Sequence, residues 1–165
     1  MVGYHVGSRV GELRKLQWPQ VDFEAGVIRL FASQTKGKVA RTLPIYGEME
    51  HWLRIQQAKP STPAQWVFLG RLDRPVGAHL DGWREACERA GLPGLFFHDL
   101  RRSAVRNLTR AGVPRHVAMA ITGHKTASVF ARYDIVSEGD IVNVKKTMEE
   151  FMEAQRKPTK LERVK

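Results

Sequence analysis

The amino-acid sequence predicts a single, mainly α-helical domain with a small antiparallel β-sheet, an α+β fold. Apolar residues recur three or four positions apart in several segments after residue 48, which is the spacing of amphipathic helices. Between Asp22 and Pro44, two short β-rich runs flank Lys36-Gly37, a pair typical of a turn. A length of 165 residues suits one hydrophobic core rather than two.

The first half of the chain predicts a helix followed by a hairpin. The helix covers about residues 9–16 and ends before Trp18-Pro19, since proline disfavours helix in the residue that precedes it. The hairpin pairs residues 27–31 with residues 39–43. Residues 66–69 form a further short strand that could complete a three-stranded sheet.

A second helix is predicted over residues 48–59, with Pro60 ending it and residues 60–64 as a connector. Its core-facing residues are Met49, Trp52 and Leu53. A third helix, ended by Gly91, carries apolar residues at helical spacing: Leu80, Trp83, Cys87 and Ala90. We expect Trp66 and Trp83 in the core, and Cys87 as a buried thiol without a chemical role.

The second half predicts three more helices. One starts near His98, ends at Gly112, and turns inward Leu100, Ala104, Val105 and Leu108. The next starts at Pro114 and buries Val117, Ala120 and Ile121 before Gly123. The last begins at a capping box over residues 137–140 and carries an apolar stripe of Ile141, Val144, Met148 and Phe151. That stripe could cover its own core or pack onto a neighbouring subunit, and residues 156–165 are expected to be a frayed basic tail.

The composition favours a nucleic-acid partner. The chain has 27 Lys and Arg residues against 17 Asp and Glu, a formal net charge of +10, and such an excess suits a polyanion. The sequence has no apolar run of membrane-spanning length and no signal-peptide pattern, so we expect a cytoplasmic, nucleoid-associated protein without a membrane partner. The single cysteine excludes an internal disulfide.

The candidate site centres on His98 and Arg101. On a helix, these two residues are three positions apart and therefore share a face. An imidazole beside a planar fork of donors suits the binding of a phosphate group. Because His-x-x-Arg also occurs on solvated helix faces, the interpretation depends on further segments: Gly7–Leu13 with Arg9 and Glu12, Gln34–Lys38, Arg41–Pro44, Gly123-His124 and Ala131–Asp134 with Tyr133.

In this order, from about Gly7 to Asp140, these segments resemble the catalytic domain of the tyrosine recombinases, the phage-integrase family. The resemblance implies a DNA breaking-and-rejoining domain over residues 1–155, with the catalytic residues Arg9, Lys36, His98, Arg101, His124 and Tyr133. Lys38 is a second choice for the hairpin lysine, and Glu12 is expected to orient Arg9. The partner would be double-stranded DNA, bound by a homotetramer that assembles through the C-terminal helix.

The same resemblance implies a site-specific recombinase or integrase of a mobile element. Relatives also carry an amino-terminal core-binding domain and a helix ahead of the Arg9 segment. Both are missing from this sequence, so we expect the chain to be a fragment. No metal and no cofactor are expected, because a phosphotyrosyl bond itself conserves the energy of the broken phosphodiester.

The implied chemistry is a transesterification in which the Tyr133 oxygen forms a 3′-phosphotyrosyl bond. A phenol ionises near pH 10 and needs a proton acceptor, for which His98 is the candidate. Arg9 and Arg101 would hold the non-bridging phosphate oxygens, where charge grows in the transition state. His124 would hydrogen-bond one of these oxygens, and Lys36 would protonate the departing 5′ oxygen.

Four other functions match part of the pattern. A type IB topoisomerase uses similar chemistry on one duplex. A non-catalytic helix-turn-helix protein would use the two helices around Gly112, but it leaves Arg9, Lys36 and Tyr133 without a role. A structural basic domain would show neither a covalent adduct nor salt-sensitive DNA binding. A hydrolase metal site is disfavoured, because no His/Asp pair has the i,i+4 spacing of a zinc helix.

Overall fold

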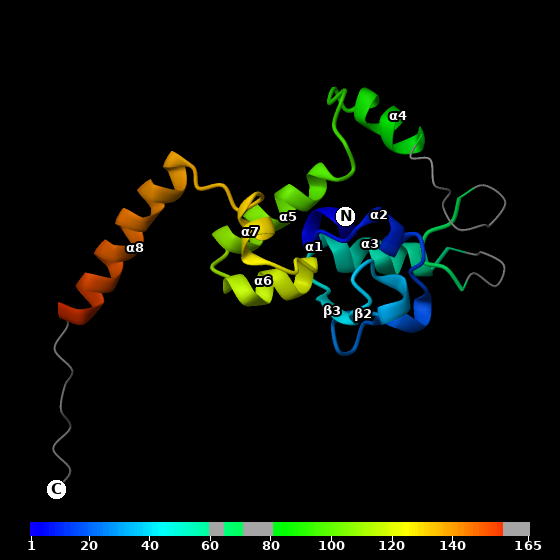
Figure 1. Ribbon diagram of the computed structural model, residues 1–165, viewed down its shortest axis with the longest axis horizontal. Helices are drawn as coiled ribbons and strands as arrows, with labels where there is room; N and C mark the ends of the chain where they lie inside the picture. The colour runs from blue at the N-terminus through cyan, green and yellow to red at the C-terminus, as the bar shows by residue number, and fades with distance from the viewer. Residues whose placement is uncertain (60–64, 71–80, 157–165) are drawn as a thin grey trace, which may run out of the picture. The chain divides into compact units, whose positions relative to one another are not determined.

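The structure, a computed structural model, describes residues 1–59, 65–70 and 81–156 (Figure 1). It divides into a first unit, Met1–Asp134, and a second unit that begins at Ile135. The connector at 60–64, Leu80 and the tail at 157–165 lie outside the described residues. Within the described ranges, no helix is both long and apolar enough to cross a membrane.

The first unit is mainly helical, as predicted. Its α-helices are α1 (Val2–Val6), α2 (Val10–Leu13), α3 (Glu48–Gln57), α4 (Asp81–Arg89), α5 (Asp99–Arg110), α6 (Arg115–Thr122) and α7 (Ala127–Ala131). Two short 3₁₀ helices, η1 (Trp18–Gln20) and η2 (Ala32–Gln34), flank the first strands. Helix α5 packs against α1 and α6, and α6 in turn packs against strand β3 (Figure 1). This arrangement brings the start of the chain beside the segments that carry His98 and Tyr133.

The sheet has three antiparallel strands in the order β1 (Val21–Asp22), β2 (Val27–Leu30) and β3 (Arg41–Pro44). The prediction that residues 66–69 supply the third strand is wrong, because that strand is β1. Residues 22 and 25 are joined by a tight turn, in which the Asp22 carboxylate accepts from the Ala25 N–H at 2.8 Å. A short local connection costs less closure entropy than pairing with a distant segment. Trp66 instead forms an isolated bridge with Gln17.

The first predicted helix is shorter than expected. Helix α2 ends at Leu13, and backbone groups of the residues that follow hydrogen-bond with the segment 65–67. The Leu16 carbonyl accepts from the Val67 N–H, and the Trp18 N–H donates to the Gln65 carbonyl, both at 2.9 Å. These bonds hold residues 16–18 outside the helix. The predicted hairpin strands are also shorter, because Phe31 begins the η2 turn and Val39 lies in the exposed loop.

The hydrophobic core lies between the sheet and the helices. Its fully buried members include Val6, Leu16, Ile28, Leu30, Leu43, Met49, Leu53, Val105 and Phe130. Three predicted core residues are exposed instead. The exposed fraction is 51% for Trp52 and 37% for Val117, and Ala120, on the same face as Val117, is also exposed. In α6 the face that meets β3 and α5 is set by Ala118, Ile121 and Thr122, so the predicted stripe is out of phase with the buried one. Cys87 is buried, as expected.

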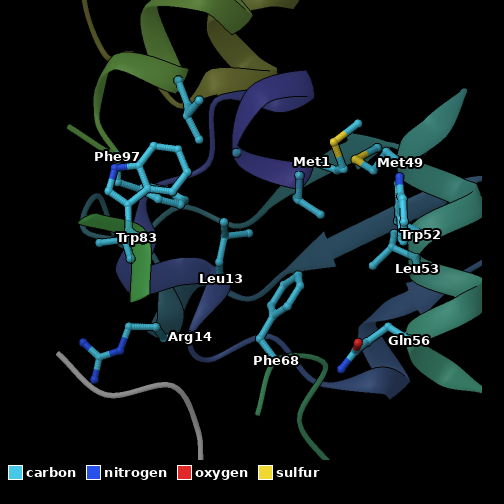
Figure 2. Close-up of a pocket in the computed structure, with 14 residues that line it drawn as sticks. Met1, Leu13, Arg14, Met49, Trp52, Leu53, Gln56, Phe68, Trp83 and Phe97 are labelled. Atoms are coloured by element: carbon cyan, nitrogen blue, oxygen red, sulfur yellow. The ribbon is translucent and has the colours of Figure 1, made fainter. Parts of the chain in front are cut away.

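An apolar pocket of 380 Å³ opens beside the core (Figure 2). Its walls come from α1, α2 and α3 together with Phe68, Trp83 and Phe97. Trp52 of α3 lines this pocket, so its side chain lies outside the core and stays exposed. The residues that line this pocket include none of the predicted catalytic residues.

The second unit contains helix α8 (Glu138–Arg156). Its start matches the predicted cap, since the Asp140 carboxylate accepts from both the backbone N–H and the hydroxyl of Ser137, at 2.8 and 2.7 Å. Along α8, the apolar side chains at 141, 144, 148 and 151 follow helical spacing and form one stripe.

Candidate active site

Tyr133 lies two residues after the end of helix α7, in contact with two histidines. Thr126 caps this helix by accepting from the Val129 N–H at 3.3 Å, and the fully buried Phe130 anchors it in the core. The phenol oxygen lies 2.9 Å from Nε2 of His98. On its other side, the Tyr133 ring centroid is 5.0 Å from that of His124. Residues far apart in the sequence therefore meet around one hydroxyl group.

His98 occupies the N-cap position of α5. The neighbouring Asp99 carboxylate accepts from the Phe96 N–H at 2.9 Å and so fixes the turn that leads into the helix. Burial, followed by the positive charge of Arg101, lowers the pKa of His98 below its usual value. At neutral pH the ring is then uncharged, and an uncharged Nε2 can accept the phenolic proton.

Arg101 lies beneath this pair, one turn along α5, with its side chain buried. Nη1 donates to the Gly7 carbonyl at 2.6 Å, and Nε donates to Nε2 of His124 at 3.3 Å. Nη2 is also buried, and among the described residues it has no hydrogen-bond partner. A buried charged donor without a partner is costly, so this nitrogen is the natural contact for an anion.

The guanidinium of Arg101 keeps its charge in this setting. Burial, followed by the like charges of Arg9 and Arg41, lowers its pKa to about 10. The group is still protonated at neutral pH. Three arginines near one another indicate a site that is electrostatically complete only with a negatively charged ligand.

His124 is held in one tautomer by its neighbours. Its Nδ1 lies 2.8 Å from the Thr122 hydroxyl, which itself donates to the Ala118 carbonyl at 2.7 Å. Nδ1 must therefore carry the proton, and Nε2 accepts from Arg101. Burial and the surrounding arginines lower the pKa of His124 to about 4, so the ring is neutral. To donate to a phosphate oxygen, as predicted, Nε2 would have to gain a proton and part from Arg101.

Arg9 and Glu12 lie together, as the sequence suggested. The Glu12 carboxylate accepts from the Arg9 backbone N–H at 2.8 Å and from its Nη1 at 3.4 Å. Arg9 also reaches the Gly123 carbonyl, at 3.4 Å through Nη2. Both guanidinium contacts are long, and the side chain is one-third exposed. Arg9 therefore retains donors that a ligand can use.

Arg41, which was not predicted as a site residue, is the closest partner of Glu12. Its Nη2 lies 2.5 Å from the Glu12 carboxylate, and only 8% of its side chain is exposed. A sign was present in the sequence. Arg41 and Leu43 are two positions apart in a strand and must share a face, and Leu43 is a core residue. An arginine on the inward face of a strand needs a buried partner.

The structure does not bring Lys36 or Lys38 into contact with these residues. Both are exposed in the loop between β2 and β3, and Lys38 adopts a left-handed backbone with φ of 52°. The loop itself forms one wall of a 790 Å³ cleft, whose other walls include Arg9, Arg41, His124 and Lys125. Lys125 was not predicted as a site residue. Its Cε would lie 3.1 Å from a Cβ placed on Gly37.

Across residues 1–59, 65–70 and 81–156, no group of three or more His, Cys, Asp or Glu side chains is arranged to hold a metal ion. The convergent groups of the site are instead cationic or neutral donors around a phenol. Such a set matches an anionic ligand.

This chain belongs to the phage integrase family, whose pattern it matches over residues 1–138. Among curated proteins it is similar to the shufflon-specific DNA recombinase of Escherichia coli, with 29% identity over 126 residues, 76% of this chain and 30% of that protein. It is also similar to the tyrosine recombinase XerC of Bifidobacterium longum, with 28% identity over 156 residues, 85% of this chain and 43% of that protein. The integrase of Salmonella phage P22 is 26% identical over 140 residues, 77% of this chain and 35% of that protein. This chain thus spans less than half the length of these relatives.

Solved structures share the fold. A crystal structure of XerA recombinase aligns with a TM-score of 0.70 at 20% identity, covering 96% of this chain and 56% of that one. The Tn1549 transposon integrase in complex with circular intermediate DNA aligns with a TM-score of 0.67 at 20% identity, covering 88% and 56%. The predicted fold class, mainly α with a small antiparallel sheet, and the family resemblance are confirmed.

Proposed function

We propose that this chain is the catalytic part of a site-specific DNA recombinase that cleaves and rejoins strands through Tyr133. One observation carries the proposal: the Tyr133 hydroxyl lies 2.9 Å from Nε2 of His98, one helical turn before Arg101, whose buried Nη2 has no partner among the described residues. The first contact supplies a nucleophile with a proton acceptor, and the second supplies a donor for an anion. The names of the relatives, DNA recombinases and an integrase in complex with DNA, support this reaction with DNA as the substrate.

In the cleavage step, the Tyr133 oxygen attacks the phosphorus of a DNA phosphodiester as its proton passes to Nε2 of His98. A 3′-phosphotyrosyl bond forms, and the bond to the 5′ oxygen breaks. Nη2 of Arg101 and the free donors of Arg9 hold the non-bridging oxygens, whose charge rises in the transition state. Rejoining reverses these steps with the 5′ hydroxyl of a partner strand, so neither water nor an energy source is consumed.

The departing 5′ oxygen must receive a proton to leave as a hydroxyl. We retain Lys36 as the candidate donor, because its loop already forms a wall of the cleft that contains Arg9 and His124. A small movement of this loop on DNA would carry the ammonium inward. His124 contributes by holding Nε of Arg101, and it gains a phosphate contact only if an arriving anion restores its proton.

The decisive experiment looks for a covalent complex. The chain is incubated with a duplex nicked near a cleavage site and run on a denaturing gel. Wild-type protein should yield a DNA-linked band. Tyr133→Phe should yield none while its DNA affinity stays within about a factor of three, since the ring still packs and only the nucleophilic oxygen is lost. Tyr46→Phe is the matched control and should behave as wild type.

Adducts formed by Tyr133→Phe, or lost in Tyr46→Phe, would contradict the assigned nucleophile. Absence of any adduct from the wild-type chain, with DNA binding intact, would instead favour the helix-turn-helix alternative. Exchange of strands between two duplexes, rather than relaxation of one, separates recombinase from type IB topoisomerase. The family match favours the recombinase.

We further propose that the full recombinase acts as a tetramer on nucleoid DNA and that the apolar stripe of α8 contacts a neighbouring subunit. The spacing of Ile141, Val144 and Met148 supports a helix-in-groove contact. Val144→Lys should therefore weaken assembly on DNA, measured by sedimentation, and leave single-site cleavage unchanged. Assembly that survives this change would argue against a role for α8.

A further inference from the structure

Arg41 connects three segments that each carry part of the site. It projects from β3 on the same face as Leu43, and its side chain is 8% exposed. Nη2 contacts Glu12 of α2 at 2.5 Å, while Nη1 donates to the Thr122 carbonyl at 2.7 Å. One planar group thus joins the strand, the Arg9–Glu12 pair and the end of α6.

The contact at Thr122 falls where a helix leaves carbonyl groups unsatisfied. Helix α6 ends at Thr122, followed by Gly123 in the left-handed conformation and then by His124. Carbonyls in a last turn lack intrahelical donors and carry partial negative charge, so a cation is favourable there. Arg41 takes the Thr122 carbonyl, and Arg9 takes the Gly123 carbonyl. The turn that presents His124 is therefore fixed by two guanidinium groups.

The turn is shaped around the Arg41 side chain. Gly123 has φ of +72°, and a Cβ placed on it would lie 1.7 Å from Nη1 of Arg41. Only glycine allows this approach. The residue before it, Thr122, holds the ring of His124 through Nδ1, so a displacement of the turn would move His124 and, through it, Arg101.

We propose that Arg41 is a positioning residue for the cleavage reaction, which sets Arg9 through Glu12 and His124 through the Thr122–Gly123 turn. This inference rests on the proposed function. Arg41 is not assigned to the substrate, because both of its terminal nitrogens already have protein partners; among the described residues, only its buried Nε has none. It also ties β3, and with it the loop that carries Lys36, to the phosphate-binding groups.

The test compares two substitutions in single-turnover cleavage of a nicked duplex, beside a binding titration on the same DNA. Arg41→Ala should slow cleavage about a hundredfold, the order expected when reacting groups shift by about 1 Å, and should change the DNA Kd less than threefold. Arg41→Lys should slow cleavage about tenfold with the same Kd, because one ammonium cannot reproduce the fork between a carboxylate and a carbonyl. Arg29→Ala is the matched control: it removes an exposed arginine of the same sheet, paired with Asp22, and should cleave as wild type.

A chemical rescue separates positioning from general loss of structure. At concentrations far below those that denature proteins, guanidinium chloride should raise the cleavage rate of Arg41→Ala at least tenfold. The same concentration of sodium chloride should not raise it. If Arg41→Ala fails to fold, Arg41→Lys alone decides, since it keeps a charge beside Glu12. The proposal would be overturned if the folded variant cleaved at the wild-type rate, or if it lost rate and affinity equally. It would also be overturned if guanidinium chloride and sodium chloride rescued cleavage to the same extent. A wild-type chain without adduct would instead defeat the proposed function.

Discussion

Replacing Arg101 by lysine should separate catalysis from binding. The arginine uses Nη1 for the Gly7 carbonyl and Nε for His124, and it leaves Nη2 for the substrate. A lysine has one nitrogen and can fill one of these positions. The attraction between a buried cation and DNA survives the change, so we expect the Kd of the complex to change by less than about threefold.

The magnitude follows from the donor that is lost. Removal of one donor to a charged transition state costs about 2.7–4 kcal/mol, or about a hundredfold to a thousandfold in rate. A Gly7 carbonyl left without its donor would add roughly 1–3 kcal/mol of lost stability, the usual cost of an unsatisfied buried group. For a chain of this length that corresponds to a drop of roughly 2–12 °C in Tm.

The assay is single-turnover cleavage of a nicked suicide substrate, with Kd and Tm measured on the same preparation. Arg102→Lys provides the matched control, because Arg102 is exposed on the same helix one residue further on. It should cleave at the wild-type rate. Equal losses of rate and affinity in Arg101→Lys would show that Arg101 only holds DNA, and the site around Nη2 would have to be redrawn.

Two more predictions follow from the turn at the end of α6. Gly123→Ala should lower both Tm and the cleavage rate, since it adds a clash with Arg41 to the strain of a positive φ. Gly112→Ala, at a residue with φ of +75° and open space around it, should cost only the backbone strain of about 1–3 kcal/mol. Equal losses of stability in the two variants would contradict the steric argument. Unfolding free energy should fall by up to about 3 kcal/mol as pH drops from 6.5 to 4, because the unfolded chain binds a proton at His124 that the folded site, with a pKa of about 4, excludes. His124→Asn should flatten this dependence in urea titrations, and an unchanged slope would contradict the buried neutral ring.

Much of the fold, and the residues proposed for most of the candidate site, could be predicted from the sequence, because these predictions depend on local rules. Helix α5 has a 3.6-residue apolar period, and its start fixes His98 and Arg101 on one face. The hairpin follows from two β-rich runs and a turn, and the cap of α8 from a serine and an aspartate three positions apart. The family order of the site residues is itself a linear property of the chain.

Tertiary structure decided what depends on contacts between distant segments. The role of Arg41 requires the register of β3 against β2 and the packing of α6 on that strand, and neither is encoded within a few residues of position 41. The tautomer of His124 follows from a bond chain through Ala118, Thr122 and Arg101. The third strand came from β1 rather than residues 66–69 because a four-residue turn closes more cheaply than a long loop. Local periodicity predicts which face of an element is buried, but only packing determines which charged groups share the space beneath it.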